Sequence, residues 1–176
     1  KAVRAATGMR MQLGGGIRTL SSIADWLELG VDRVILGTVA LKDPDLVREA
    51  CRVFPGQIMV GIDAKSGHVA TEGWAETSNM KATDLGRAFA DVGVAAIIFT
   101  DIDRDGLLEG VNVDATRQMA LAANLPVIAS GGVASLLDID RLLDANIPLL
   151  EGVISGRAIY DGRLDLGEAL KKLAKN

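Results

Sequence analysis

Two acidic residues that could take part in catalysis lie at the ends of apolar segments in the middle of the chain. Asp63 ends one such segment, and Thr100 ends another and is followed by three aspartates, of which Asp105 is the last. A carboxyl group held at the end of a buried strand can act as a general acid or base. We therefore interpret Asp63 as a catalytic candidate. Alternation in this turn does not decide whether Asp105 faces the same site.

A glycine-rich unit occurs twice, once near each end of the chain. The first copy supplies Gly15, Gly16, Gly37 and Thr38, and the second supplies Gly131, Gly132, Gly156 and Arg157. Glycines let backbone N–H groups approach a phosphate closely, and an arginine grips phosphate through two N–H groups. One copy alone would indicate only a tight turn. Two copies at matching spacing predict a ligand that carries two phosphates.

The overall composition excludes several classes of protein. The net charge is −4 with 19 basic and 23 acidic residues, which argues against a nucleic-acid-binding face. The lack of a long apolar run predicts no membrane contact. The lone Cys51 excludes a disulfide framework and favours a reducing, cytoplasmic setting. With one histidine and no cluster of ligands, we expect no metal site.

The elements that must position these residues alternate strictly along the chain. Strands are expected at Arg10–Leu13, Arg33–Gly37, Ile58–Asp63, Ala95–Thr100, Pro126–Ser130 and Gly152–Gly156. Helices are expected at Ser21–Leu29, Asp45–Val53, Thr83–Val92, Val113–Ala123, Leu136–Asp144 and Asp165–Lys175. Such alternation predicts parallel strands in a doubly wound sheet or a (β/α)₈ barrel. The internal repeat favours the barrel, because two-fold symmetry places equivalent turns around one mouth.

Six units do not close a barrel of eight. Residues 1–8 are typical of the last turns of a helix, so we expect the chain to begin within the second unit. The prediction is one partial TIM-barrel domain over residues 1–176, with barrel strands 3–8 and without the first two βα units. An open sheet exposes two edges, so self-association or complementation by another segment is expected.

The long connection from Ala64 to Ala82 is expected to form a small hairpin over the mouth of the barrel. Gly67 suits the tight turn of such a hairpin. Trp74 lies within this connection, where it could stack on a flat ring of the ligand or serve as a buried anchor for the loop.

Six motifs together resemble one enzyme family. They are QLGGGIRT, VILGT, GIDAKSGHVATEGW, FTDIDRDG, VIASGGV and GVISGRAIYDG, in this order along nearly the whole chain. The sequence is thereby similar to the phosphoribosylformimino-aminoimidazole carboxamide ribotide isomerases of histidine biosynthesis. The resemblance implies a (β/α)₈ barrel with an internal repeat and a substrate with two phosphates. It also implies an Amadori rearrangement of an aminoaldose to an aminoketose without a cofactor.

The resemblance also assigns roles to individual residues. Asp63 would be the general acid that protonates the ribose ring oxygen, and Thr100 would position the reacting part of the substrate. Trp74 would cover the ring that carries the carboxamide, while Arg18 and Asp105 would help to hold the substrate in the cleft. A second catalytic aspartate of the family, at the end of the first barrel strand, has no match in this chain. The chain by itself is therefore expected to be inactive or nearly so.

Three other interpretations remain open at the level of sequence. The sister cyclase barrel of histidine biosynthesis shares the fold and both phosphate sites, although the Glu72-Gly73-Trp74 loop favours the isomerase. A bifunctional isomerase would act on phosphoribosylanthranilate as well. A non-catalytic fragment would bind bisphosphate ligands or pair with a complementing piece.

Overall fold

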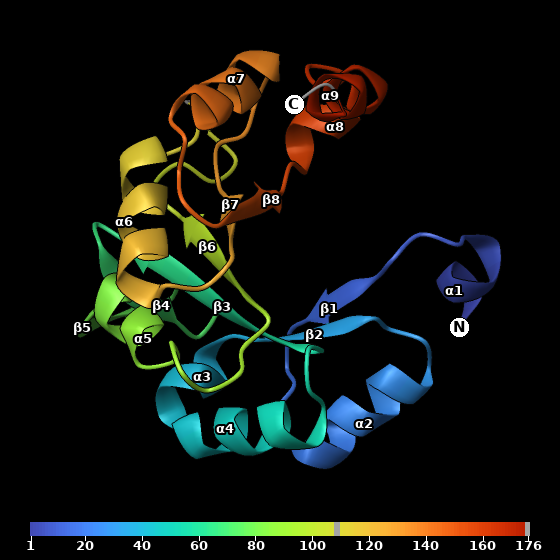
Figure 1. Cartoon of the computed structure of the whole chain (residues 1–176), viewed down its shortest axis with the longest axis vertical. Helices are drawn as coiled ribbons and strands as arrows, with labels where there is room; N and C mark the ends of the chain where they lie inside the picture. The colour runs from blue at the N-terminus through green and yellow to red at the C-terminus, as the bar shows by residue number, and fades with distance from the viewer. Residues whose placement is uncertain (108–109, 175–176) are drawn as a thin grey trace.

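The computed structural model describes residues 1–107 and 110–174 and shows a curled sheet with helices around its outer side (Figure 1). Its main path consists of six parallel strands in the order β1-β2-β3-β6-β7-β8. These strands are β1 (Gln12–Gly14), β2 (Arg33–Leu36), β3 (Ile58–Lys65), β6 (Ala96–Asp101), β7 (Val127–Ser130) and β8 (Leu150–Val153). The predicted partial TIM barrel is confirmed.

Helices follow the strands and cover the convex face of the sheet (Figure 1). The longer ones are α2 (Leu20–Glu28), α4 (Pro44–Val53), α5 (Ala82–Arg87), α6 (Val113–Ala123), α7 (Leu136–Asp144) and α9 (Leu166–Leu173). The short ones are α1 (Ala2–Ala6), α3 (Thr38–Lys42) and α8 (Arg157–Tyr160). The helix expected near the N-terminus is therefore present as α1. The expected C-terminal end at Lys175 lies outside the described residues.

Most of the expected elements differ in their limits by one or two residues, and two differ more. The helix predicted to reach Val92 ends at Arg87, because the chain continues in tighter turns in which Phe89 and Val92 donate to carbonyls three residues back. The last strand begins at Leu150 rather than Gly152. A register irregularity between Val127 and Ile128 accommodates the additional residues of β8.

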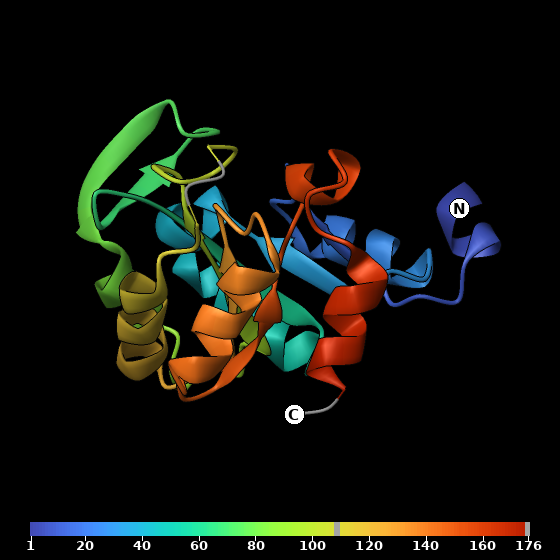
Figure 2. The same cartoon turned by 90° about the horizontal axis from the view of Figure 1, so that it is seen from above.

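The predicted hairpin is present and extends the central strand. β3 turns at Ser66 and Gly67 into β4 (His68–Thr71), which pairs with β5 (Glu76–Lys81). Both turn residues have positive φ, 49° and 80°, as a two-residue type I′ turn requires. Seen from above, the hairpin stands clear of the barrel body beside the mouth (Figure 2).

Apolar side chains fill the two faces of the sheet separately. The large cluster lies between the sheet and the helices and includes Ile23, Val60 and Phe89, all fully buried. A small cluster lies on the other face, where Met59 and Ile98 pack with Ala96, Ile128 and Ile35. Interior layers of branched residues from neighbouring strands are the normal filling of a TIM barrel. The layer above them is polar and forms the candidate site.

An ion pair shows how strongly the sheet curls. The Arg33 guanidinium on β2 contacts the Glu151 carboxylate on β8 at 2.7 Å, although three other strands lie between them in the sheet. Both side chains are about one-third exposed, so the pair itself adds little stability. Between β8 with α8 and α9 on one side and β1 with α1 on the other, the barrel is open (Figure 1).

The sequence repeat is also a structural repeat. Gly37 after β2 and Gly156 after β8 have similar backbone angles, with φ of −94° and −112° and ψ of −111° and −89°. Each is the N-cap of a short helix, α3 or α8, that the sequence did not predict. The two halves therefore leave the strand in the same way after the glycine.

The other glycine turns of the two halves differ in their surroundings. Gly15, Gly16, Gly131 and Gly132 all have positive φ, between 71° and 105°. A methyl group added at Gly15 or Gly16 would meet only open space. One added at Gly131 would overlap the Asp101 carbonyl, and at Gly132 the carbonyl of Gly110. The second turn is packed tightly against the loop after β6.

None of the helices within residues 1–107 and 110–174 combines the length and the apolar character needed to cross a membrane.

The difference in packing between the two glycine turns predicts unequal effects of the same substitution. Gly15→Ala places alanine at positive φ and should cost about 1–2 kcal/mol of unfolding free energy. Gly131→Ala adds an overlap with backbone and should cost about 3 kcal/mol or more. Urea unfolding followed by circular dichroism measures both values, with Gly15→Ala as the matched control. Equal losses in the two variants would contradict the close packing of the second turn.

Candidate active site

Three polar side chains form a row at the carboxyl ends of the central strands. Parallel pairing places Asp63 of β3 opposite Thr100 of β6, and Thr100 opposite Ser130 of β7. Directly below them, Gly61, Ile98 and Ile128 form the adjoining layer. Because side chains two residues apart share one face of a strand, the whole row faces the concave side.

The row borders a cleft of about 620 Å³ at the mouth of the barrel. From the first half, this cleft is lined by Gly15, Gly16, Arg18, Gly37 and Thr38, and from the row by Asp63, Thr100 and Ser130. The structure thus brings the first predicted phosphate site and both predicted catalytic residues to one cavity. Active sites of TIM barrels lie at this end of the strands.

The second predicted phosphate site forms a smaller cavity of about 200 Å³. It is lined by Gly131, Gly132, Gly156 and Arg157 together with Asp105 and Gly106. Ser130 and Ile154 line both cavities, so the two cavities adjoin at these residues. One elongated ligand could therefore reach both glycine units.

Arg157 is held in a fixed orientation within the second cavity. One guanidinium N–H donates to the Gly106 carbonyl at 3.2 Å, and the Nε lies 3.4 Å from the Asp161 carboxylate. These contacts leave other donors of the five-donor fork for an anion. The guanidinium is also tied to the loop after β6, which carries Asp105.

Trp74 is not the buried anchor that was one of the two expectations, because its indole is 44% exposed. The indole N–H instead donates to the Asp63 carboxylate at 2.8 Å. This hydrogen bond orients the Asp63 side chain.

The segment that carries Trp74 is fastened to the first half as well. Glu72 forms an ion pair with Lys42 at the end of α3, and its hydrogen bond to Lys42 holds the pKa of the Glu72 carboxyl below its usual range. Glu72 and Gly73 line the large cleft. Glu72, Gly73 and Trp74 all have positive φ, from 52° to 74°, which is an unusual run for two residues with side chains. We name residues 72–74 the strap.

The three aspartates after Thr100 separate into different environments. Asp105 lines the second cavity. Asp101 and Asp103 instead border a separate cavity, beside Ser66 and Asn112. Sequence alternation left this distribution open, and the turns over residues 102–107 decide it.

Two residues of the site were missed in the sequence. Ser130 lines both cavities, and its position at the end of a predicted strand, just before the second glycine turn, could have indicated it. Glu72 lines the cleft, yet no pattern predicts its ion pair with Lys42, 30 positions earlier. Long-range pairing of this kind depends on the fold.

Two further kinds of chemistry concern Cys51 as a nucleophile and the acidic residues as metal ligands. Cys51 is buried, and burial raises the pKa of its thiol to about 11, which makes it a poor nucleophile. Within the described part of the chain, no three His, Cys, Asp or Glu side chains are grouped closely enough to hold a metal ion.

Known proteins similar to this chain match it over nearly its whole length and are themselves longer. A family model described as "Histidine biosynthesis protein" matches residues 1–165. The similar curated proteins are named as isomerases. Their substrate is a phosphoribosyl imidazole carboxamide that carries a (phosphoribosylamino)methylideneamino group. The one from Mesorhizobium japonicum is 61% identical over 169 residues, which are 96% of this chain and 68% of the relative.

Two further relatives carry the same isomerase name. The protein from a Jannaschia species is 60% identical over 99% of this chain and 72% of its own length. The protein from Brucella ovis is 59% identical over 98% of this chain and 71% of its own length. Because the family model and these relatives cover nearly the whole chain at high identity, the chain belongs to the histidine biosynthesis protein family.

Proposed function

We propose that this chain provides the larger part of an isomerase that rearranges an aminoaldose with two phosphoribosyl groups to an aminoketose. The observation that carries the proposal is the row of Asp63, Thr100 and Ser130, which lies between the two glycine units at adjoining cavities. The relatives' printed name contains two phosphoribosyl groups, in agreement with two phosphate sites.

Each phosphate would bind at one glycine unit. At the first, backbone N–H groups of the Gly15-Gly16 turn and of Thr38 would donate to the anion, with Arg18 supplying charge at the edge of the same cleft. At the second, the Gly131-Gly132 turn and the Arg157 guanidinium would do so. The protein as a whole is acidic, so these local donors must supply the attraction.

Asp63 would begin the reaction by donating a proton to the ribose ring oxygen. The bond between that oxygen and C1 then breaks, and the nitrogen lone pair forms a protonated imine at C1. Loss of the proton from C2 gives an enolamine, and transfer of the C2 hydroxyl proton to C1 then gives the aminoketose. Thr100 lies beside Asp63 and would hydrogen-bond the opening sugar, and no step requires a cofactor.

Trp74 would set the orientation of Asp63 through its indole N–H and cover the carboxamide-bearing ring with its exposed face. These two roles are compatible, because the N–H lies in the plane of the indole ring and leaves both π-faces available. Asp105, on the second cavity, would contact the other end of the substrate.

The base that removes the C2 proton would come from outside these 176 residues. The sheet is open between β8 and β1, where a barrel of eight has two further parallel strands. We propose that these strands, from a longer chain or from a separate segment, close the barrel and supply this base. Self-association at the open side is the alternative way to cover the two edges. A reducing, cytoplasmic setting stays a prediction.

Reconstitution tests this proposal. The 176-residue chain alone should show no measurable isomerisation, because half of the acid–base pair is absent. Mixing it with the part of the Mesorhizobium japonicum relative that lies outside the aligned residues should restore turnover, followed by absorbance or chromatography of the product. Turnover by the unaccompanied chain at the level of the mixture would overturn the proposed division. Binding without turnover in the mixture would favour a purely ligand-binding protein.

The same mixture tests the role of Asp63. Asp63→Asn keeps an oxygen that can accept from the Trp74 indole but removes the acidic proton. We expect turnover to fall about a hundredfold or more, with little change in the dissociation constant of the bisphosphorylated ligand.

The matched control is Asp45→Asn, the same change at a side chain on α4 that is 93% exposed, and it should leave turnover unaltered. If Asp63→Asn and Asp45→Asn are equally active, Asp63 is not the general acid.

A further inference from the structure

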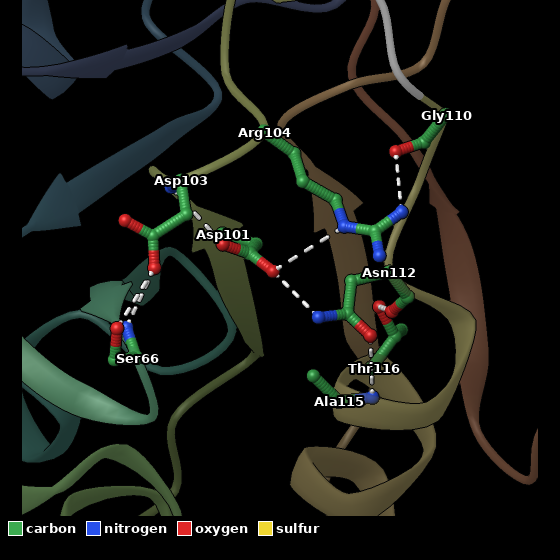
Figure 3. A network of polar contacts seen from close by, with 8 residues as sticks. All are labelled: Ser66, Asp101, Asp103, Arg104, Gly110, Asn112, Ala115 and Thr116. Carbon is green, nitrogen blue, oxygen red and sulfur yellow. Dashed lines mark hydrogen bonds and ion pairs between the residues drawn. The ribbon is translucent and has the colours of Figure 1, made fainter.

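The loop after β6 is joined to the hairpin by polar contacts (Figure 3) and packs closely against the second glycine turn. Its residues Asp101, Asp103 and Arg104 contact Ser66 on one side and Asn112 and Gly110 on the other. None of these side chains lines either cavity of the candidate site. These side chains therefore have a role other than direct contact with a ligand in those cavities.

Asp103 fastens the turn of the hairpin. One carboxylate oxygen accepts from the Ser66 backbone N–H at 2.8 Å and from the Ser66 hydroxyl at 3.2 Å (Figure 3). Ser66 is the first residue of the two-residue turn that follows β3, three positions after Asp63. The bond thus joins the loop after β6 to the hairpin that leads to the strap. A carboxylate that accepts from a backbone N–H makes one of the stronger kinds of hydrogen bond.

Asp101 fixes the other end of this loop. Its carboxylate accepts from the Asn112 side-chain amide at 2.6 Å and from the Asp103 backbone N–H at 3.1 Å. Asn112 also caps α6 by accepting from the Ala115 N–H at 3.1 Å. The Arg104 guanidinium lies 3.9 Å from the Asp101 carboxylate and donates to the Gly110 carbonyl at 3.2 Å. These contacts join residues 101–104 to Gly110 and Asn112.

The same loop supports the second phosphate site. The Asp101 and Gly110 carbonyls stand against Gly131 and Gly132 so closely that neither glycine has room for a methyl group. Gly106 of the loop accepts from the Arg157 guanidinium. An anion bound to Arg157 or to the Gly131-Gly132 turn is therefore held by groups that are in direct contact with this loop.

We propose that Asp103 is a positioning residue that couples the second phosphate site to the hairpin, whose Trp74 contacts Asp63. Phosphate bound at Gly131, Gly132 and Arg157 stabilises the loop after β6. Because Asp103 of this loop binds Ser66, the same phosphate also stabilises β4, β5 and the strap. The substrate end farthest from the strap thereby helps to close it. This inference rests on the proposed binding of phosphate at the second site.

Hydrogen exchange at backbone amides, read by mass spectrometry, tests the coupling in the 176-residue chain with inorganic phosphate as the probe. Phosphate should slow exchange at 131–133 and in the hairpin, residues 66–81. The part of the hairpin response that Arg157→Ala abolishes comes from the second site. We expect this Arg157-dependent effect of phosphate to lower the exchange rate of the hairpin amides about fivefold or more, which is the lower range for coupling between sites.

Asp103→Ala should remove this part of the hairpin response while phosphate still slows exchange at 131–133. A merely structural contact would change the hairpin without phosphate but not its response to phosphate. Asp103→Asn, which retains one accepting oxygen, should recover a fraction of the response. The matched control Asp45→Ala, a loss of the same charge on α4, should behave as the parent.

The outcomes separate this inference from the function on which it rests. If phosphate slows exchange at 131–133 and the Arg157-dependent hairpin response persists in Asp103→Ala, the coupling role is wrong and the phosphate site stands. The same conclusion follows if Arg157→Ala does not diminish the hairpin response. If phosphate changes nothing at 131–133 in the parent, the second phosphate site itself is wrong and the coupling falls with it.

Discussion

Hydrogen bonds between β3 and β6 hold Asp63 beside Thr100, and those between β6 and β7 hold Thr100 beside Ser130. This parallel register is the constraint on which the site depends. A shift by one residue would turn all three side chains into the helix layer and bring apolar ones to the mouth. The fully buried residues between these strands and the helices, Val60 and Ile97 among them, make such a shift costly.

The two halves of the chain use this framework differently. Gly15 and Gly16 lie in open surroundings, whereas Gly131 and Gly132 are enclosed by carbonyls of the loop after β6. The first site is bordered by the strap through Glu72 and Gly73, and the second is bordered by the loop that carries Asp105. A substrate that spans both sites would therefore meet a closely packed turn at one end and a fastened but exposed hairpin at the other.

Much of this arrangement could be predicted from the sequence, because it follows from local patterns. α6 and α7 have the predicted limits, since each is a clear amphipathic or capped segment between turn residues. The glycines at positive φ were recognisable for the same reason. The start of β8 was wrong because Leu150 enters the sheet through a register irregularity that only pairing with β7 defines.

Contacts between distant segments could not be predicted. The Trp74–Asp63 hydrogen bond depends on how the hairpin folds back over the strand that leads to it. The direction of Asp103 depends on the turns after β6 and on the presence of Ser66. Motif spacing places residues near a site, but hydrogen bonds across loops decide which of them face the ligand.

Calorimetric titration tests most directly the central claim that one ligand occupies both glycine units. A compound with two phosphoribosyl groups should bind with a stoichiometry of one. Its affinity should exceed that of either singly phosphorylated half by about a hundredfold or more, as expected when two linked groups bind together. Two equivalents bound per chain, or an affinity no better than that of the halves, would contradict the account.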